Sequence, residues 1–303
     1  MVTSSAGAGL TIRARRAVLW FACLAVCAGD RPLQAQPAPP ARIVSTSPNI
    51  TETLFALGLG DRVVGVSKFC RFPPAVAALP KVGTFLRPDA EIIARLRPDL
   101  VFVHTGPNAI VAQLDALGIR TTTIAPGSLA AVFSTIRDIG AAAGVPARAE
   151  RLVGDITSRL ERVTIAVAGR PRRTVLIIVG RRTGTLTDMV AVGRGSYLSD
   201  IAAFAGGANV LATATQYPRI SMETVISLAP DILIDVGEMG ESPDDSALRR
   251  RITEGLWQRQ DLVTAVRAGA VHVTTDDAFV VPGPRMIDVA ELMATWFHGV
   301  RFP

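Results

Sequence analysis

Cys70 and His104 have side chains that can ligate a metal or act in catalysis. A protein-bound zinc ion takes three or four ligands, so a lone thiol and a lone imidazole do not predict a metal site. His272 falls within a predicted strand and His298 near the C-terminus. We therefore expect no metal centre, and each histidine is interpreted as an ordinary buried or surface residue.

Enzyme signatures are the second chemistry to consider. No G-x-G-x-x-G follows the strand-like segments 43–44 and 174–179, and Gly193-Arg194-Gly195 lacks a strand-turn-helix context. No G-x-S-x-G elbow is present, and three histidines are few for a catalytic triad. We expect a protein without catalytic residues or cofactor. A secreted α/β enzyme such as a Rossmann-type oxidoreductase remains the alternative, because a coarse βα pattern fits it too.

Two carboxylates, Glu52 and Glu223, fall near the starts of predicted helices in different halves of the chain. A helix dipole stabilises a carboxylate there by about 0.3–1 kcal/mol. Helix capping is therefore one interpretation of both residues.

The composition predicts compact α/β domains. Of 303 residues, 49% are hydrophobic and 19% charged. The net charge of +6 falls to +3 without residues 1–36, which hold four arginines and one aspartate. No basic cluster is interleaved with aromatic residues, so we expect no nucleic-acid partner. Beyond residue 36 Cys70 is the sole cysteine, which excludes an internal disulfide there.

The N-terminus has the pattern of an export signal over residues 1–36. Arginines precede an apolar run over 17–29, and small residues follow it. A transmembrane anchor is the alternative, but the run is shorter than a helix needs to cross ~30 Å of hydrocarbon. We expect a periplasmic protein exported by the Sec or the twin-arginine route, with lipid anchoring at Cys27 as a second possibility. Residues 37–41 are a proline-rich tether.

Alternating strand and helix patterns follow. An N-terminal α/β lobe is predicted over 42–145, one connecting helix over 146–169, and a C-terminal α/β lobe over 170–303. Expected strands of the first lobe are 42–45, 63–66, 100–104 and 121–124, and its helices are 53–59, 89–96, 111–117 and 129–143. Expected strands of the second are 174–179, 231–236 and 270–274, and its helices are 197–205, 222–227 and 285–297.

The two halves also repeat one motif. Residues 89–100 match residues 221–232 at a glutamate, at the apolar positions, and at Pro and Asp. In each, an amphipathic helix ends before proline and a buried strand follows. The sequence therefore predicts two βα lobes with central, mainly parallel sheets joined by one long rigid α-helix.

Several motifs, in this order, make the chain resemble a known family. They include Ile43-Val44-Ser45 followed by Pro48-Asn49-Ile50-Thr51-Glu52, Leu79-Pro80-Lys81-Val82-Gly83, Ala205-Gly206-Gly207-Ala208-Asn209 and Pro282-Gly283-Pro284-Arg285. The chain resembles the periplasmic binding proteins of vitamin B12, ferric siderophore and haem ABC importers, whose two lobes are joined by a single helix. No single motif is diagnostic, but their order covers nearly the whole chain after the signal.

The resemblance implies a function. It implies a monomer that captures a small-molecule metal chelate between its lobes and delivers it to the dimeric transmembrane permease of an ABC importer. Glu52 and Glu223 are the implied permease-docking residues. The implied ligand-binding residues are Phe69, Arg71, Phe72, Phe85, His104, Phe279 and Arg285. Each has an ordinary alternative, since phenylalanine is usually core and surface arginine usually solvated.

The ligand class stays open at this point. We expect cobalamin, another corrinoid or a ferric siderophore. Haem is less favoured, because neither Tyr197 nor Tyr217 falls where the family's haem-ligating tyrosines are expected. A metal-insertion accessory protein of the same fold is a further alternative, since fold alone does not decide function.

Overall fold

The computed structural model describes residues 38–106, 109–125, 127–237 and 245–302. Residues 38–303 form one compact unit. The predicted signal over 1–36 and the first residue of the tether therefore lie outside the described residues. Among the helices that are described, none combines the length and apolar character that a membrane span requires.

The first sheet has four parallel strands in the order β2-β1-β3-β4. The central strands β1 and β3 consist largely of buried β-branched and aromatic residues, which is typical of a sheet covered on both faces. We call this part of the chain the N-terminal lobe. Its strands are β1 (Ile43–Ser45), β2 (Val63–Val66), β3 (Leu100–His104) and β4 (Thr121–Ile124), and its helices are α1 (Pro48–Ala56), α2 (Ala90–Arg95), α3 (Ile110–Ala116) and α4 (Leu129–Ala142).

The second sheet has six strands in the order β10-β9-β5-β6-β8, with β7 paired to β5. Its pairs are parallel except those that β6 makes with β5 and β8. We call this part the C-terminal lobe. Its strands are β5 (Arg173–Gly180), β6 (Met189–Ala191), β7 (Gly207–Asn209), β8 (Arg219–Ile220), β9 (Ile232–Asp235) and β10 (Val271–Val273), and its helices are α6 (Tyr197–Phe204), α7 (Met222–Leu228), α8 (Ser246–Trp257), α9 (Thr264–Arg267) and α10 (Met286–His298).

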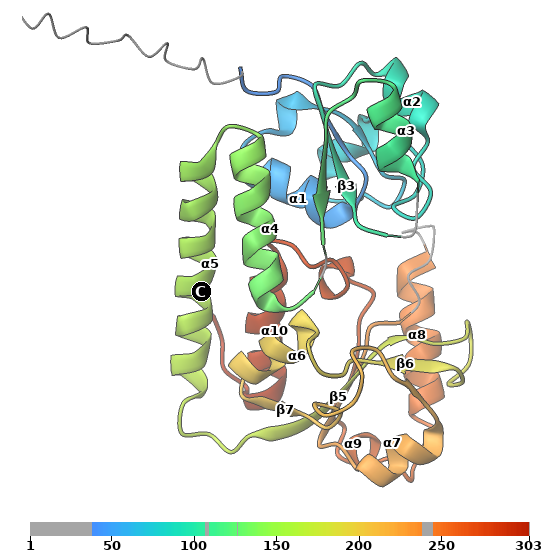
Figure 1. Ribbon diagram of the computed structural model, residues 1–303. Coiled ribbons are helices and arrows are strands. Elements are labelled where there is room, and N and C mark those ends of the chain that lie inside the picture. Colours follow the sequence, from blue (N-terminus) through green and yellow to red (C-terminus); the bar gives the residue numbers. More distant parts are fainter. Residues whose placement is uncertain (1–37, 107–108, 126, 238–244, 303) are drawn as a thin grey trace, which may run out of the picture. The chain divides into compact units, whose positions relative to one another are not determined.

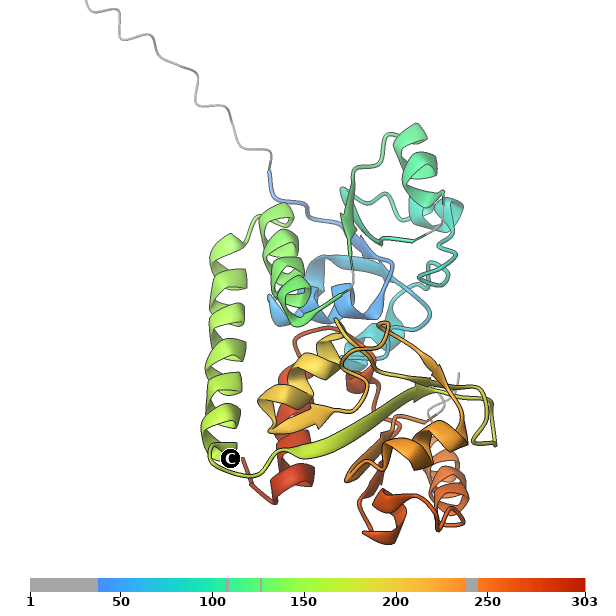
Figure 2. The same ribbon diagram turned by 60° about the horizontal axis from the view of Figure 1, so that its bottom comes forward.

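The long helix α5 (Pro146–Val167) links the two lobes (Figures 1 and 2). Pro146 starts it and Gly169, with φ 75°, follows its end. Its buried residues recur every three or four positions and pack against α4 and α10. Arg159, from the exposed side, contacts Asp288 at 2.7 Å and Glu291 at 2.7 Å on α10. The predicted single connecting helix is thus present, and it is fixed to the C-terminal lobe by packing and charge.

The repeat seen in the sequence is also a repeat in structure. The side chains of Asp89 and Ser221 cap α2 and α7, each accepting a hydrogen bond from the backbone N–H three residues ahead. After each helix, Asp99 or Asp231 accepts backbone N–H groups from the start of the neighbouring strand. Each lobe therefore contains the same short capped helix followed by a buried strand.

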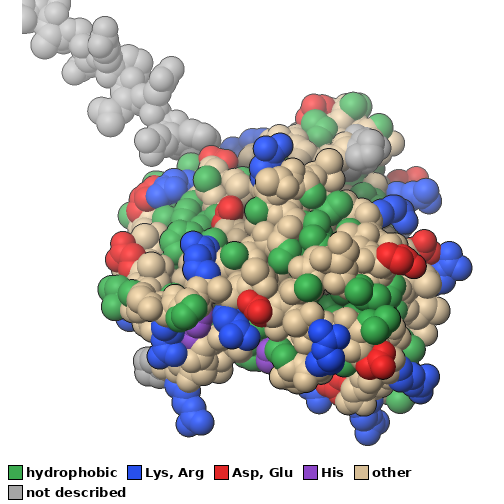
Figure 3. All heavy atoms as spheres, turned by 90° about the horizontal axis from the view of Figure 1, so that it is seen from below, with side chains coloured by type: hydrophobic (Ala, Val, Ile, Leu, Met, Phe, Trp, Pro, Cys, Tyr) green, Lys and Arg blue, Asp and Glu red, His purple; other side chains and the backbone are tan. Residues whose placement is uncertain are grey.

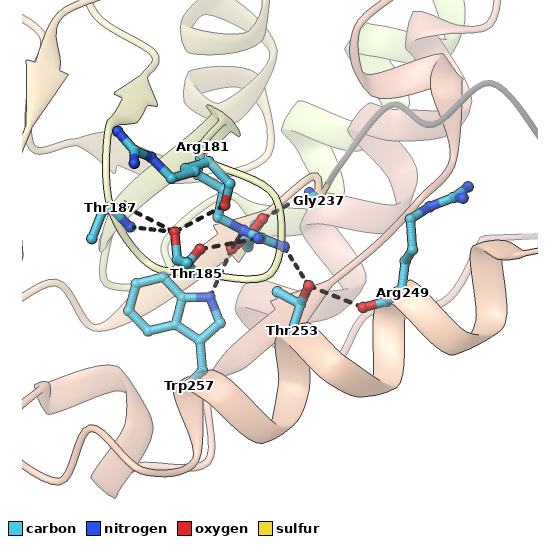
Figure 4. A network of polar contacts seen from close by, with 9 residues as sticks. Arg181, Thr185, Thr187, Gly237, Arg249, Thr253 and Trp257 are labelled. Atoms are coloured by element: carbon cyan, nitrogen blue, oxygen red, sulfur yellow. Dashed lines mark hydrogen bonds and ion pairs between the residues drawn. The ribbon is translucent and has the colours of Figure 1, made fainter.

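A buried polar network ties the C-terminal lobe together (Figure 4). Asp235, at the end of β9, accepts hydrogen bonds from Arg181 Nε at 3.1 Å, from Trp257 Nε1 at 2.7 Å and from the backbone N–H of Gly237 at 2.7 Å. Arg181 also donates to Thr253 on α8. Both charged side chains are at most 1% exposed. The network holds the ends of β5 and β9 against α8.

Charged side chains at the surface are arranged differently from the buried pair of Arg181 and Asp235. On the face shown in Figure 3, basic and acidic side chains are interspersed with small groups of apolar ones. The pair Arg182–Asp188 is an example of an exposed contact, with side chains 68% and 49% exposed. Such pairs contribute little to stability because water and salt screen them.

We predict that Asp235→Asn lowers the free energy of unfolding by about 3–5 kcal/mol, because it removes the negative charge that contacts the buried Arg181 guanidinium at 3.1 Å. Asp188→Asn is the matched control and should cost less than about 1 kcal/mol. Urea denaturation of both variants measures this. Equal losses in the two variants would show that the buried pair is no more important than the exposed one.

Candidate ligand-binding site

A cavity of about 640 Å³ lies at the carboxyl ends of parallel strands from both lobes. Ser47 follows β1, Phe69 follows β2, His104 ends β3, Gly127 follows β4, and Val179 lies near the end of β5. Open α/β sheets commonly place ligands at this edge. The C-terminal lobe adds Tyr197, Gln216, Tyr217, Asp277, Val280, Val281 and Pro282 to the lining.

Three aromatic rings line one side of the cavity in sequence. The ring centroids of Phe69 and Phe85 are 5.8 Å apart, and those of Phe85 and His104 are 5.7 Å apart. Both spacings fall in the range that favours edge-to-face contact. We call Phe69, Phe85 and His104 the aromatic strip. Neighbouring rings are inclined by 56° and 64°, so the strip offers both ring faces and ring edges to a ligand.

His104 combines a fixed position with a neutral ring. Its backbone N–H donates to Thr46 Oγ1 at 3.1 Å, which fixes the end of β3. Burial lowers the pKa of His104 below its ordinary value, so the imidazole is neutral at neutral pH. A neutral imidazole keeps a lone pair free for a metal ion or a hydrogen-bond donor.

The polar groups of the cavity are mostly uncharged. Hydroxyl and amide groups come from Ser47, Asn49, Gln216 and Tyr217. Arg71 and Asp277 are the charged lining residues that the described chain contributes, and they have opposite signs. The cavity therefore suits a ligand whose edge carries uncharged hydrogen-bonding groups better than a ligand with several negative charges.

The structure brings four of the predicted ligand-binding residues to this cavity, namely Phe69, Arg71, Phe85 and His104. Their roles in binding stay predictions. The other three lie elsewhere. Phe279 is a core residue, with 0% exposure and its ring stacked on Trp296 at 5.7 Å. The expectation that it touches the ligand is wrong for this structure, because the 3-10 turn over Asp277–Phe279 directs it inward.

Phe72 and Arg285 line a second cavity of about 420 Å³, together with Glu52 and residues of α5. The Arg285 guanidinium lies 4.3 Å from the centroid of the Phe72 ring. They therefore contact each other rather than the cavity that Phe85 and His104 line.

Glu52 is buried, contrary to what a docking residue at the surface requires. Its carboxylate accepts hydrogen bonds from Arg285 Nε at 2.9 Å and from an Arg285 terminal nitrogen. Burial raises the pKa of Glu52 above its ordinary value, although the bonds from Arg285 oppose the shift. Glu52 was predicted to contact the permease and Arg285 to contact the ligand, but in the structure the two side chains pair with each other.

Glu223, in contrast, is fully exposed in the first turn of α7. The hydrogen bond from Ser221 lowers the pKa of Glu223, so it is ionised at neutral pH. Its counterpart in the structural repeat is Glu91, which is exposed in the first turn of α2. The sequence match between residues 89–100 and 221–232 already carried this signal, since it aligns these two glutamates.

Residues that the sequence argument missed include both tyrosines. Tyr217 is 47% exposed, whereas Tyr197 is buried and donates its hydroxyl to Phe279 O at 2.6 Å. Both line the large cavity. Tyrosine side chains are therefore present in the cavity lining, which removes one reason for ranking haem below the other chelates. Among the described residues, no group of three or more His, Cys, Asp or Glu side chains is placed to hold a metal ion.

Comparison with known proteins identifies the family. The family model described as periplasmic binding protein matches residues 43–278. The chain belongs to this family, and it is a substrate-binding component of an ABC importer.

Individual relatives cover most of both chains. An uncharacterized ABC transporter substrate-binding lipoprotein, YvrC, of Bacillus subtilis (strain 168) is 28% identical over 84% of this chain and 79% of its own. The vitamin B12-binding protein of Salmonella typhimurium is 29% identical over 66% of this chain and 74% of its own. The periplasmic heme-binding protein RhuT from Roseiflexus sp. RS-1 has a TM-score of 0.71 and 29% identity, covering 85% of this chain and 98% of that one.

We predict that Cys70 is unreactive in the folded protein. Its thiol is buried, 3.1 Å from Thr51 Oγ1, and burial raises its pKa to about 11. At pH 8 alkylation by iodoacetamide, followed by mass spectrometry of the Cys70 peptide, should be at least ~100-fold slower than that of free cysteine. Denaturation in urea should restore the ordinary rate. Equal rates with and without urea would place the thiol at the surface.

Proposed function

We propose that this substrate-binding protein captures a corrinoid in the large cavity and delivers it to its importer. The observation that carries the proposal is the combination of an aromatic strip with a mostly neutral hydrogen-bonding lining. Pockets of this size, apolar with a few convergent polar groups, are typical of small-molecule sites.

The charges in the cavity favour a corrinoid over the other chelates. A corrin ring carries carboxamides on its rim, which pair with hydroxyl and amide side chains. Haem carries two propionates and many ferric siderophores are anionic, so both need cationic partners. Arg71 is the cationic lining residue in the described chain, and Asp277 opposes it. Among the relatives, vitamin B12-binding proteins support the corrinoid, and heme-binding proteins make haem the main competitor.

A titration tests the proposal. The protein is titrated with aquacobalamin, hemin, ferrichrome and NAD, and binding is followed by calorimetry and by the melting temperature. We expect aquacobalamin to bind most tightly and NAD not to bind. Tighter binding of hemin or ferrichrome would overturn the corrinoid assignment, and a shift with NAD would favour the enzyme alternative.

We predict that Phe85→Ala weakens aquacobalamin binding about tenfold or more, because it removes the middle ring of the aromatic strip. Phe204→Ala is the control, since Phe204 is 38% exposed and does not line the cavity. It should bind like the unaltered protein. Equal affinities of the two variants would show that the ligand does not lie on this strip.

We also propose that Glu91 and Glu223 are the pair that meets the permease. Both are exposed carboxylates at equivalent places in the two lobes, and charges at such an interface set register and association rate. This replaces Glu52, whose carboxylate is buried and held by Arg285.

Reversal of both charges in Glu91→Arg/Glu223→Arg should abolish corrinoid-dependent growth or uptake in cells that carry the importer. Ligand affinity should not change, because neither residue lines the cavity. The control Glu161→Arg/Asp261→Arg makes the same change of net charge at other exposed positions. Uptake that survives in the first double variant would contradict the docking assignment.

A further inference from the structure

A buried ion cluster lies between the two cavities. Arg285 Nε is 2.9 Å from one carboxylate oxygen of Glu52, and an Arg285 terminal nitrogen contacts the other. That same nitrogen donates to Asp277 Oδ1 at 2.7 Å. The side chains of Glu52, Arg285 and Asp277 are 3%, 16% and 17% exposed. One guanidinium is thus shared by two largely buried carboxylates.

The cluster joins the two lobes. Glu52 lies on α1 of the N-terminal lobe, whereas Arg285 precedes α10 and Asp277 begins a 3-10 turn of the C-terminal lobe. A second polar bridge between the lobes runs from the backbone N–H of Leu129 to Asp200 at 3.0 Å. Separating the lobes would therefore expose or unpair charges that are now desolvated.

The guanidinium is fixed from several sides. The Phe72 ring packs on its face at 4.3 Å, and Asp276 lies 3.5 Å from its remaining terminal nitrogen. Its two bonds to Glu52 form a bidentate pair, which adds geometric specificity to attraction. Arg285 therefore has one orientation, and it fixes the carboxylate of Asp277 with it.

Asp277 connects this cluster to the large cavity. It lines the large cavity, while Glu52 and Arg285 line the smaller one. Because the cavity is lined from both lobes, separation of the lobes would open it, and the same movement would break the Glu52–Arg285 pair.

We propose that Glu52, Arg285 and Asp277 form an interlobe latch that holds the cavity in its binding geometry before the ligand arrives and sets the rate of ligand release. In this account Glu52 and Arg285 are positioning residues, and they act through Asp277 and through the lobe separation. Preorganisation of this kind improves affinity by lowering the ordering cost of binding. The statement on release rests on the proposed ligand function, whereas the statement on lobe geometry does not.

Two measurements test the latch. Spin labels at Asp115→Cys and Gln258→Cys, both exposed and in different lobes, report the interlobe distance of the ligand-free protein by pulsed electron paramagnetic resonance. Stopped-flow displacement reports the aquacobalamin dissociation rate. The variant is Glu52→Gln, which keeps the shape and removes the charge. The control is Glu161→Gln, which makes the same change at an exposed residue outside the cluster and both cavities.

We expect a single narrow distance distribution in the unaltered protein and in Glu161→Gln. Glu52→Gln should broaden it toward longer distances and speed dissociation about tenfold or more. Arg285→Met should act in the same direction, and if it does not fold, Glu52→Gln alone decides. A wild-type distance distribution and dissociation rate in Glu52→Gln would overturn the latch. Failure of the unaltered protein to bind aquacobalamin would instead overturn the corrinoid assignment, and the distance measurement would still decide the latch.

Discussion

The geometry of the large cavity depends on the ion pairs that the Arg285 guanidinium makes. The guanidinium pairs with Glu52, which the chain delivers from a position 233 residues away, and with Asp277 at the cavity wall. A buried ion pair of this kind costs desolvation that its attraction does little more than offset, so its main effect is on geometry rather than on net stability. The directions of the pKa shifts show the same opposition between desolvation and ion pairing. Burial raises the pKa of Glu52, and the two carboxylates raise the pKa of Arg285 although its own burial opposes the shift.

The position of Arg285 depends in turn on α5. Arg159 on α5 holds Asp288 and Glu291 on α10, and burial of the α10 side chains holds that helix against α5 and α6. Arg285 directly precedes α10, and α10 is packed and ion-paired against the connecting helix α5. The connecting helix therefore helps to place the charge that meets Glu52. The connecting helix and the latch therefore both restrain movement of one lobe relative to the other, and residues of both line the smaller cavity.

Much of the fold could be predicted from the sequence. Strands such as β3 and helices such as α5 match their expected bounds closely, because apolar periodicity and Pro or Gly at the ends mark them. The strands β6 and β8 were missed, since two or three residues carry no period, and α8 was missed because its exposed face is strongly polar. Those β6 pairs also make the second sheet mixed rather than wholly parallel.

The site was less predictable than the fold. Residues after parallel strands, such as Phe69 and His104, reach the cavity because strand direction alone carries them there. The sequence did not predict where three other side chains lie. A local turn sets the position of Phe279, and a long-range ion pair sets the positions of Glu52 and Arg285. Neither feature produces a periodic pattern in the sequence. The repeat of α2 and α7 was visible in the sequence and already aligned Glu91 with Glu223, whereas the burial of Glu52 became visible only in the structure.

The most direct measurement is the identity of the ligand that the protein carries when it is isolated from its native host. An absorption spectrum of the purified protein, followed by mass spectrometry of the extracted ligand, determines it. The account predicts a cobalt corrinoid, recovered in a stoichiometric amount that Phe85→Ala lowers. Recovery of haem, with its iron and its Soret absorption, or of a ferric siderophore would contradict it.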